Sequence, residues 1–224
     1  MKTSLKNIVF AGGGLKGWAY IGTIRALEEL VIRKDIENII GVSIGSVFGL
    51  FYLLGIDYKT LLDFFIHLDF KKFMDIDIDN FLINQSIFTG VYFKKFIKEL
   101  ISYKVNPDIT FNELTYYSKI TFTVNALNIN KSEVKYFNHI RTPNIKVIDA
   151  IMASCSLPLV FPSYKINDEY YYDGGICNNC PVDLVDELGT IAFDFGGTTC
   201  CDTNNSKIKI IDLIFSIINI TNKK

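Results

Sequence analysis

A serine flanked by glycines is the residue best placed for nucleophilic chemistry in this 224-residue chain. Ser43 stands at the centre of a G-x-S-x-G pentapeptide, with Gly41 and Gly45 at its ends. A short apolar segment precedes it and a nearly all-apolar one follows, which is the strand–turn–helix setting of a nucleophile elbow. The glycines remove Cβ atoms from a tight turn, and the N-terminus of the helix favours developing negative charge. The same residues also fit a serine that only caps a helix.

A run of glycines near the N-terminus offers backbone amides to a ligand. Gly12, Gly13 and Gly14 lie between an apolar segment and a helical one, and Lys16 follows them. In an ester hydrolase such amides would hold a tetrahedral oxyanion. The run also fits the dinucleotide fingerprint G-x-G-x-x-G, but that site needs an acid at the end of the next strand. Here the next strand ends at the serine motif, so the pattern disfavours dinucleotide binding.

An aspartate followed by two glycines is the third candidate. Asp173 comes at the end of a short predicted strand, before Gly174 and Gly175. An aspartate in this setting can stand free in a cleft with backbone groups close by. Taken alone, the motif fits an ordinary Asp-Gly turn equally well.

The two histidines lie outside any familiar catalytic pattern. His67 falls in an aromatic helical stretch that suits a core or snorkelling histidine, and His139 follows a predicted strand as a loop residue. A Ser-His-Asp triad needs a histidine that can move at the site. A carboxylate serving the serine directly is the simpler hypothesis, and both histidines stay open as alternative bases.

Taken together, these motifs resemble the patatin-like phospholipase family. Four segments carry the resemblance: the glycine-rich oxyanion loop with its basic residue, the nucleophile elbow, a proline-bearing segment, and the catalytic aspartate motif with the N-x-P after it. They lie in the family's order at residues 8–17, 40–46, 153–162 and 173–181.

The resemblance implies a three-layer α/β/α sandwich around a mainly parallel sheet. It implies one patatin-like acyl hydrolase domain over residues 1–224. The sequence departs from the family pattern at the C-terminus, where members often run on past the last strand and this chain stops after residues 208–220. Hydrophobic periodicity agrees with alternating strands and helices. Strands are predicted at residues 6–11, 38–42, 120–127, 134–137, 170–172 and 190–195, and helices at 15–31, 44–54, within 57–84, at 90–102, from 110 onward and at 146–154.

The activity that the resemblance implies is a serine lipid acyl hydrolase, a carboxylic ester hydrolase with a catalytic dyad. Ser43 would attack the ester carbonyl, and Asp173 would take its proton and later activate water. The amides of the glycine run would form the oxyanion hole, and Lys16 would bias the local field. Supporting positions would be Gly41, Gly45, Gly174 and Gly175. The alternatives are an acyltransferase and a catalytically weak lipid-binding protein on the same fold.

The substrate class implied is phospholipid or another acyl ester, with no metal or organic cofactor. Three aspartates alternate at residues 75–79, but an EF-hand also needs a glycine and a glutamate where Asn80 and Ser86 stand. The C-x-x-C at residues 177–180 and the adjacent pair Cys200 and Cys201 lack a histidine to complete a zinc site.

Composition and charge limit the remaining classes of partner. The net charge is −1 and no basic run appears, so nucleic acid is not an expected partner. Five cysteines without a secretory signal predict free thiols in a reducing compartment, cytoplasmic or host-intracellular. No segment is long and apolar enough for a membrane span. Aromatic residues between 51 and 96 and an amphipathic helix at residues 208–220 predict peripheral membrane contact.

Overall fold

A computed structural model describes residues 5–30, 32–69 and 86–196 of the chain. Within these residues, strands form one sheet in the order β5-β6-β3-β2-β1-β7, and β4 also pairs with β3. Strands β7, β1, β2 and β3 are parallel neighbours, and β5 runs in their direction because it is antiparallel to β6, which is antiparallel to β3. The strands are Asn7–Phe10 (β1), Asn38–Gly41 (β2), Thr121–Asn128 (β3), Glu133–Phe137 (β4), Tyr164–Ile166 (β5), Glu169–Asp173 (β6) and Thr190–Phe193 (β7).

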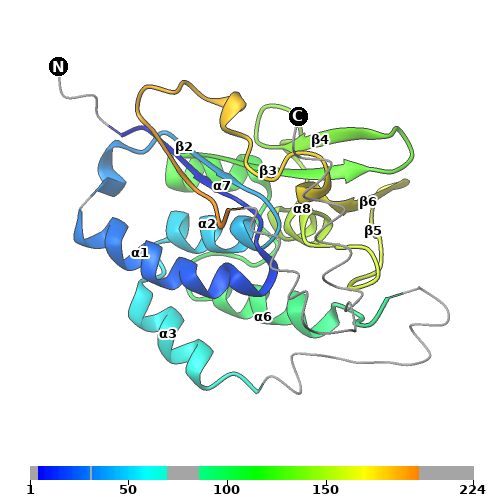
Figure 1. Cartoon of the computed structure of the whole chain (residues 1–224), viewed down its shortest axis with the longest axis horizontal. Coiled ribbons are helices and arrows are strands. Elements are labelled where there is room, and N and C mark those ends of the chain that lie inside the picture. Colours follow the sequence, from blue (N-terminus) through cyan, green and yellow to red (C-terminus); the bar gives the residue numbers. More distant parts are fainter. Residues whose placement is uncertain (1–4, 31, 70–85, 197–224) are drawn as a thin grey trace, which may run out of the picture.

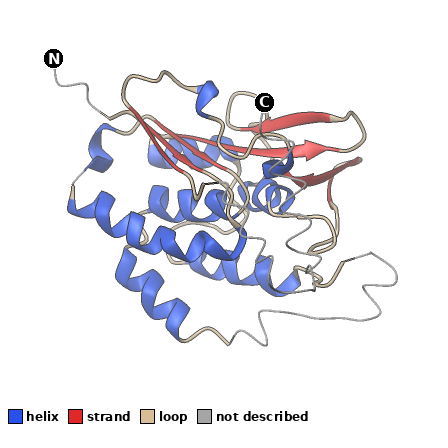
Figure 2. Ribbon diagram, in the orientation of Figure 1, coloured by secondary structure: helices blue, strands red, loops and turns tan. Residues whose placement is uncertain are grey.

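Helices lie on both sides of this mostly parallel sheet. Figures 1 and 2 show α1, α3 and α6 below the sheet and the short helix η4 above it. The α-helices are Tyr20–Glu29 (α1), Ile44–Leu54 (α2), Tyr58–Ile66 (α3), Val91–Ser102 (α6), Phe111–Ser118 (α7) and Val147–Ser154 (α8). The 3-10 helices are Gly14–Ala19 (η1), Ile32–Asp35 (η2), Gly174–Ile176 (η3) and Val182–Leu184 (η4). The predicted α/β/α architecture is confirmed.

Strand β3 aligns the two strands that lead into the candidate site. Val124 pairs with Gly41 of β2 and also with β4, and Ala126 pairs with Asp173 of β6 and also with β4. A residue has one partner on each side, so β2 and β6 share the edge of β3 opposite β4. β2 ends at Gly41 and the antiparallel β6 ends at Asp173. The carboxyl ends of β2 and β6 therefore approach each other two residues apart along β3.

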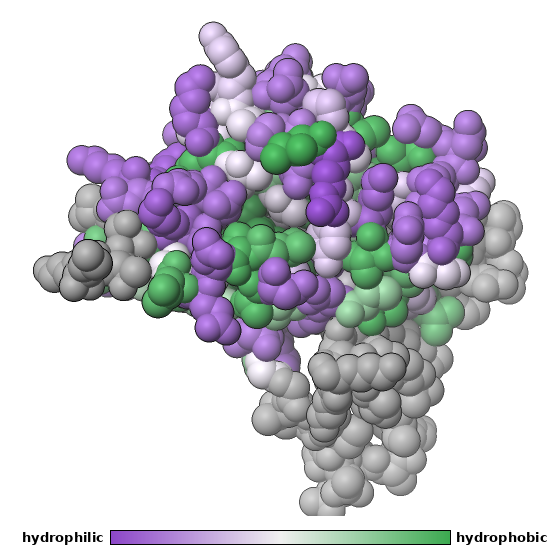
Figure 3. Space-filling model, turned by 90° about the horizontal axis from the view of Figure 1, so that it is seen from above, coloured by the Kyte–Doolittle hydropathy of each residue, from purple (hydrophilic) through white to green (hydrophobic). Residues whose placement is uncertain are grey.

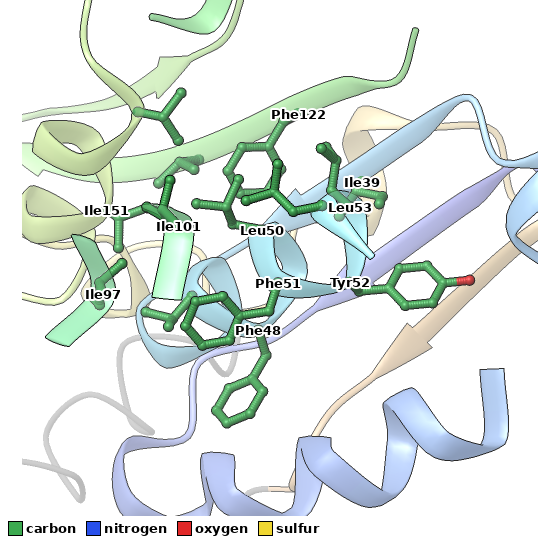
Figure 4. Close-up of a cluster of buried hydrophobic side chains, with 14 of the residues drawn as sticks. Ile39, Phe48, Leu50, Phe51, Tyr52, Leu53, Ile97, Ile101, Phe122 and Ile151 are labelled. Atoms are coloured by element: carbon green, nitrogen blue, oxygen red, sulfur yellow. The ribbon is translucent and has the colours of Figure 1, made fainter. Parts of the chain in front are cut away.

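The core is centred on helix α2, which follows β2 directly. Every residue of α2 after the first is buried. Its side chains lie among Ile39 and Phe122 of the sheet, Ile97 of α6 and Ile151 of α8 (Figure 4). Fully burying an apolar side chain of this size stabilises the fold by about 1.5–3 kcal/mol. The packing of α2 therefore holds the turn before it firmly in place.

The sequence-based element boundaries agree with the structure in most segments. The capping box of α7 is confirmed, because the Thr110 side chain accepts from the Glu113 amide and Glu113 accepts from the Thr110 amide. The pairing of β3 with β4 is also confirmed. Within the predicted helical region 57–84 the structure gives α3, and residues 70–85 lie outside the described part. The predicted helix 208–220 lies outside it too.

Strand β5 and the start of the first helix differ from the sequence prediction. β5 was not predicted, and it joins β6 through a two-residue turn in which Asn167 has a positive φ of 55°. The predicted helix at residues 15–31 begins instead as the 3-10 helix η1 and becomes α-helical at Tyr20. In the part of the chain that the structure describes, no helix is long and apolar enough to cross a membrane.

Candidate active site

Ser43 lies on a strained turn between β2 and α2. Its backbone has φ 51° and ψ −130°, outside the regions that a non-glycine residue ordinarily occupies. The glycines on either side make this turn sterically feasible. A Cβ on Gly41 would lie 2.4 Å from Ser46 Cα, and one on Gly45 would lie 2.3 Å from the carbonyl oxygen of Phe10. Ser43 thus lies on a tight strand–turn–helix segment, the backbone setting that a nucleophile elbow requires.

Asp173, at the end of β6, is hydrogen-bonded directly to this serine. Ser43 Oγ donates to Asp173 Oδ2 at 2.6 Å, and the amide of Gly175 donates to Asp173 Oδ1 at 2.7 Å. The aspartate is 4 % exposed. Burial raises the pKa of its carboxyl from 3.8 to about 6, and the hydrogen bonds from Ser43 and Gly175 oppose that rise. A buried carboxylate with a raised pKa that accepts a hydrogen bond directly from a serine hydroxyl can act as a general base.

Gly174 allows the chain to turn away immediately after the aspartate. A Cβ on Gly174 would lie 2.4 Å from both the backbone carbonyl oxygen and Oδ1 of Asn125 in β3. The Asn125 side-chain amide in turn donates to the carbonyl of Asn178 at 2.9 Å. The loop after Asp173 is therefore fastened to β3.

The glycine run lies beside the same serine. A Cβ on Gly12 would lie 3.2 Å from Ser43 Cβ and 2.4 Å from Asn179 Oδ1. Gly12 and Asn179 exchange hydrogen bonds: the Gly12 amide donates to the Asn179 carbonyl at 3.2 Å, and Asn179 Nδ2 donates to the Gly12 carbonyl at 3.1 Å. The Gly12 amide is thus engaged. The amides of Gly13 and Gly14 donate to no other residue of the described segments.

Lys16 and the histidines lie apart from the hydrogen bonds of the dyad. Lys16 is exposed, and its amide donates to the Gly13 carbonyl at 3.1 Å. His67 ends α3 with its side chain 75 % exposed, and its Nδ1 lies 2.8 Å from the carbonyl of Asp63. His139 is half-buried in the turn after β4. Neither histidine is hydrogen-bonded to Ser43 or Asp173.

Ser154 is a site residue that the sequence reasoning missed. It is fully buried at the end of α8, and its hydroxyl accepts the Ser43 backbone amide at 2.8 Å. The amide of the strained residue is therefore fixed from a helix 111 residues away. Ser46 fixes the carbonyl side of the turn, because its Oγ donates to the Ser43 carbonyl at 2.6 Å. The one available signal in the sequence was that Ser154 lies in the proline-bearing segment that resembles the family. The resemblance assigned no role to this serine.

The cysteines of the described segments, Cys155, Cys177 and Cys180, carry free thiols. Cys155 is buried, and desolvation, followed by the nearby charge of Asp173, raises the pKa of its thiol well above the usual value. It therefore remains protonated, and a protonated thiol is a weak nucleophile. Among residues 5–30, 32–69 and 86–196, no three His, Cys, Asp or Glu side chains gather as metal ligands. The aspartates of residues 75–79 and the pair Cys200 and Cys201 lie outside these segments.

The family model for patatin-like phospholipases matches residues 8–186. The chain belongs to this family. It is 28 % identical over 185 residues to the probable lipid hydrolase 463L of Invertebrate iridescent virus 6, covering 80 % of this chain and 62 % of that protein. It is 26 % identical over 244 residues to triacylglycerol lipase 4 of Saccharomyces cerevisiae, covering 94 % of this chain and 25 % of the lipase. The chain thus spans less than two thirds of the length of these relatives.

Solved structures agree with the fold. VipD from Legionella pneumophila superposes with a TM-score of 0.69 at 18 % identity, covering 84 % of this chain and 49 % of VipD. ExoU from Pseudomonas aeruginosa, solved with SpcU, superposes with a TM-score of 0.53 at 19 % identity, covering 70 % and 39 %. Identities this low bear on the architecture alone.

Proposed function

We propose that this protein is a lipid acyl hydrolase that cleaves carboxylic esters of phospholipids or other acyl lipids. The observation that carries the proposal is the 2.6 Å hydrogen bond from Ser43 Oγ to the buried carboxylate of Asp173. Membership of a phospholipase family and relatives named as lipases support the lipid substrate class.

In the proposed first half-reaction, Asp173 Oδ2 takes the proton of Ser43 as Oγ attacks the ester carbonyl carbon. The carbonyl π electrons move to the oxygen, and the resulting oxyanion is held by the amides of Gly13 and Gly14. When the tetrahedral intermediate collapses, the ester C–O bond breaks and Asp173 returns the proton to the leaving alcohol. The product of this step is an acyl ester on Ser43.

In the second half-reaction, Asp173 takes a proton from a water molecule that attacks the acyl carbon. Collapse of the second intermediate breaks the bond to Ser43 Oγ, which recovers its proton from Asp173, and the fatty acid leaves. Throughout, the Gly175 amide holds Oδ1, so that Oδ2 stays aimed at the serine. The backbone contacts from Ser154 and Ser46 hold the nucleophile in its strained conformation.

The test is hydrolysis of a panel of acyl esters, from a soluble nitrophenyl ester to phosphatidylcholine and triacylglycerol, by the wild type, Ser43→Ala and Asp173→Asn. Hydrolysis by the wild type with a loss of about 10²-fold or more in each variant supports the dyad. Activity that persists in folded Ser43→Ala would reject it.

We also propose peripheral contact with the lipid surface.

A further inference from the structure

An apolar groove lies between helix α3 and the first helical segment of the chain, which is formed by η1 and α1. It has a volume of about 440 Å³. The Trp18 and Phe65 rings lie 4.2 Å apart at one end of it, and the Arg25 guanidinium lies 5.4 Å from the Tyr58 ring at the other. The two helical segments are therefore antiparallel along the groove. Leu62 and Ile66 add aliphatic lining from α3.

The rim of the groove carries large apolar side chains in solvent. Ile66 is 69 % exposed and Leu62 is 44 % exposed. Leu15, 70 % exposed, precedes Trp18 by three residues in a 3-10 helix, where side chains at this spacing lie on one face. Exposed aliphatic groups gathered next to Trp and Tyr rings are typical of surfaces that meet an apolar partner. By contrast, hydrophobic residues on the face shown in Figure 3 are interspersed with hydrophilic ones.

The Trp18 end of the groove is joined to the candidate active site. Helix η1 begins at Gly14, directly after the proposed oxyanion amide of Gly13. Gly17 packs against the residue that follows the proposed nucleophile, since a Cβ on it would lie 2.3 Å from Ile44 Cγ1. The apolar rim at Leu15 is thus within one helical turn of the loop that would face the reacting ester.

Charge along the groove does not suit recognition of an anionic group. Arg25 is the cation that lines it, and its guanidinium is already paired with Glu29 at 2.8 Å and lies near the Tyr58 ring. The groove therefore suits a partner with an apolar surface and no net charge. An aggregate of zwitterionic lipid has this chemistry, and it is also where the substrate of the neighbouring site would be found.

We propose that Leu15, Trp18, Leu62 and Ile66 form a lipid-docking surface that inserts among the acyl chains of a zwitterionic bilayer. Insertion there holds η1, and with it the glycine loop, against the lipid from which an ester must be drawn. The role of this surface in bringing substrate to the site rests on the proposed function. The binding of the protein to a lipid bilayer does not depend on catalysis.

Binding is tested first, with vesicles of phosphatidylcholine and the full chain in a Ser43→Ala background, where no lipid is consumed. Ile66→Asn is compared with Ile140→Asn, which changes an isoleucine that is 75 % exposed in the turn after β4. We expect Ile66→Asn to lower the partition coefficient about tenfold, because an inserted apolar side chain is lost, and Ile140→Asn to leave it unchanged. Raising the salt concentration should have little effect. Leu62→Asn supplies a second variant if Ile66→Asn does not fold.

Activity is tested next, with Ser43 intact, as the ratio of hydrolysis on vesicles to hydrolysis of a soluble short-chain ester. We expect this ratio to fall in Ile66→Asn and to hold in Ile140→Asn. Equal partitioning of the wild type, Ile66→Asn and Ile140→Asn would overturn the docking surface. So would a concentration-dependent dimer that Ile66→Asn abolishes while vesicle binding is unchanged, since a second copy would then be the occupant. If no ester is cleaved but the binding pattern holds, the proposed function fails and the docking surface stands.

Discussion

Replacing Asp173 with asparagine is predicted to stabilise the fold while it removes activity. Asparagine has nearly the shape of aspartate, and its oxygen can accept from the Gly175 amide while its NH₂ donates to Ser43 Oγ, which now accepts. Both hydrogen bonds survive, but the buried charge is gone. Hydrolysis should fall by about 10²–10⁴-fold, the usual contribution of a general base.

The gain in stability follows from the raised pKa of Asp173. The carboxyl titrates at about 6 in the fold against 3.8 without burial, so keeping it ionised costs about 3 kcal/mol. Because the native state holds the proton more tightly, the wild type loses stability as the pH rises from 3.8 through 6, and the full cost applies above 6. The free energy of unfolding of Asp173→Asn should exceed that of the wild type by about 3 kcal/mol at pH 8 and by about half as much at pH 5.

Urea unfolding at these two pH values measures the difference. Asp168→Asn is the matched control, because its side chain is fully exposed and its substitution should change stability by less than about 0.5 kcal/mol. In the wild type, hydrolysis of a soluble ester should rise with pH through about 6 as the base ionises. An Asp173→Asn protein that is less stable than the wild type at pH 8, or that gains equally at both pH values, would refute this reasoning.

The remaining predictions concern the nucleophile, the base and the elbow. A fluorophosphonate probe should label Ser43 alone, and peptide mass spectrometry that located the adduct on another serine would contradict the assignment. His67→Ala and His139→Ala should keep activity on a soluble ester, whereas a 10²-fold loss in either folded variant would revive a triad. Ser154→Ala should lower kcat about tenfold with KM unchanged, because the part-buried Ser43 amide loses its acceptor, while Ser156→Ala should leave both constants as they are. EDTA should not change the rate of hydrolysis, and a loss that calcium restores would argue for a metal.

The proximity of Ser43 and Asp173 could be anticipated only through family resemblance. Each motif taken alone fitted a cap or a turn, and 130 residues separate them. Their meeting depends on β2 and β6 ending two residues apart on one edge of β3, and pairing register is not visible in a local pattern. Apolar runs and turn residues did locate the parallel strands and α2, because those elements are buried and their composition follows from burial.

The contacts that support the site were beyond sequence reasoning for a different reason. The Ser154 hydroxyl accepts from the Ser43 backbone, and the Asn179 side chain donates to the Gly12 backbone. Because the bonded groups of Ser43 and Gly12 are backbone atoms, their residue types do not reveal these contacts in the sequence. Strand β5 was missed because three residues are too few to establish a period-2 pattern, although Asn167 after it is a turn residue.

The geometry also bears on how a serine could work here without histidine. At 2.6 Å between Ser43 Oγ and Asp173 Oδ2, no imidazole fits between them, so the carboxylate itself must be the base in the proposed reaction. An ordinary aspartate is a weak base at neutral pH. Burial raises its pKa to about 6 and brings its basicity closer to that of a histidine. The same burial destabilises the ionised protein. Basicity and instability thus have one cause, and a change that lets water reach Asp173 should restore stability and lower the rate together.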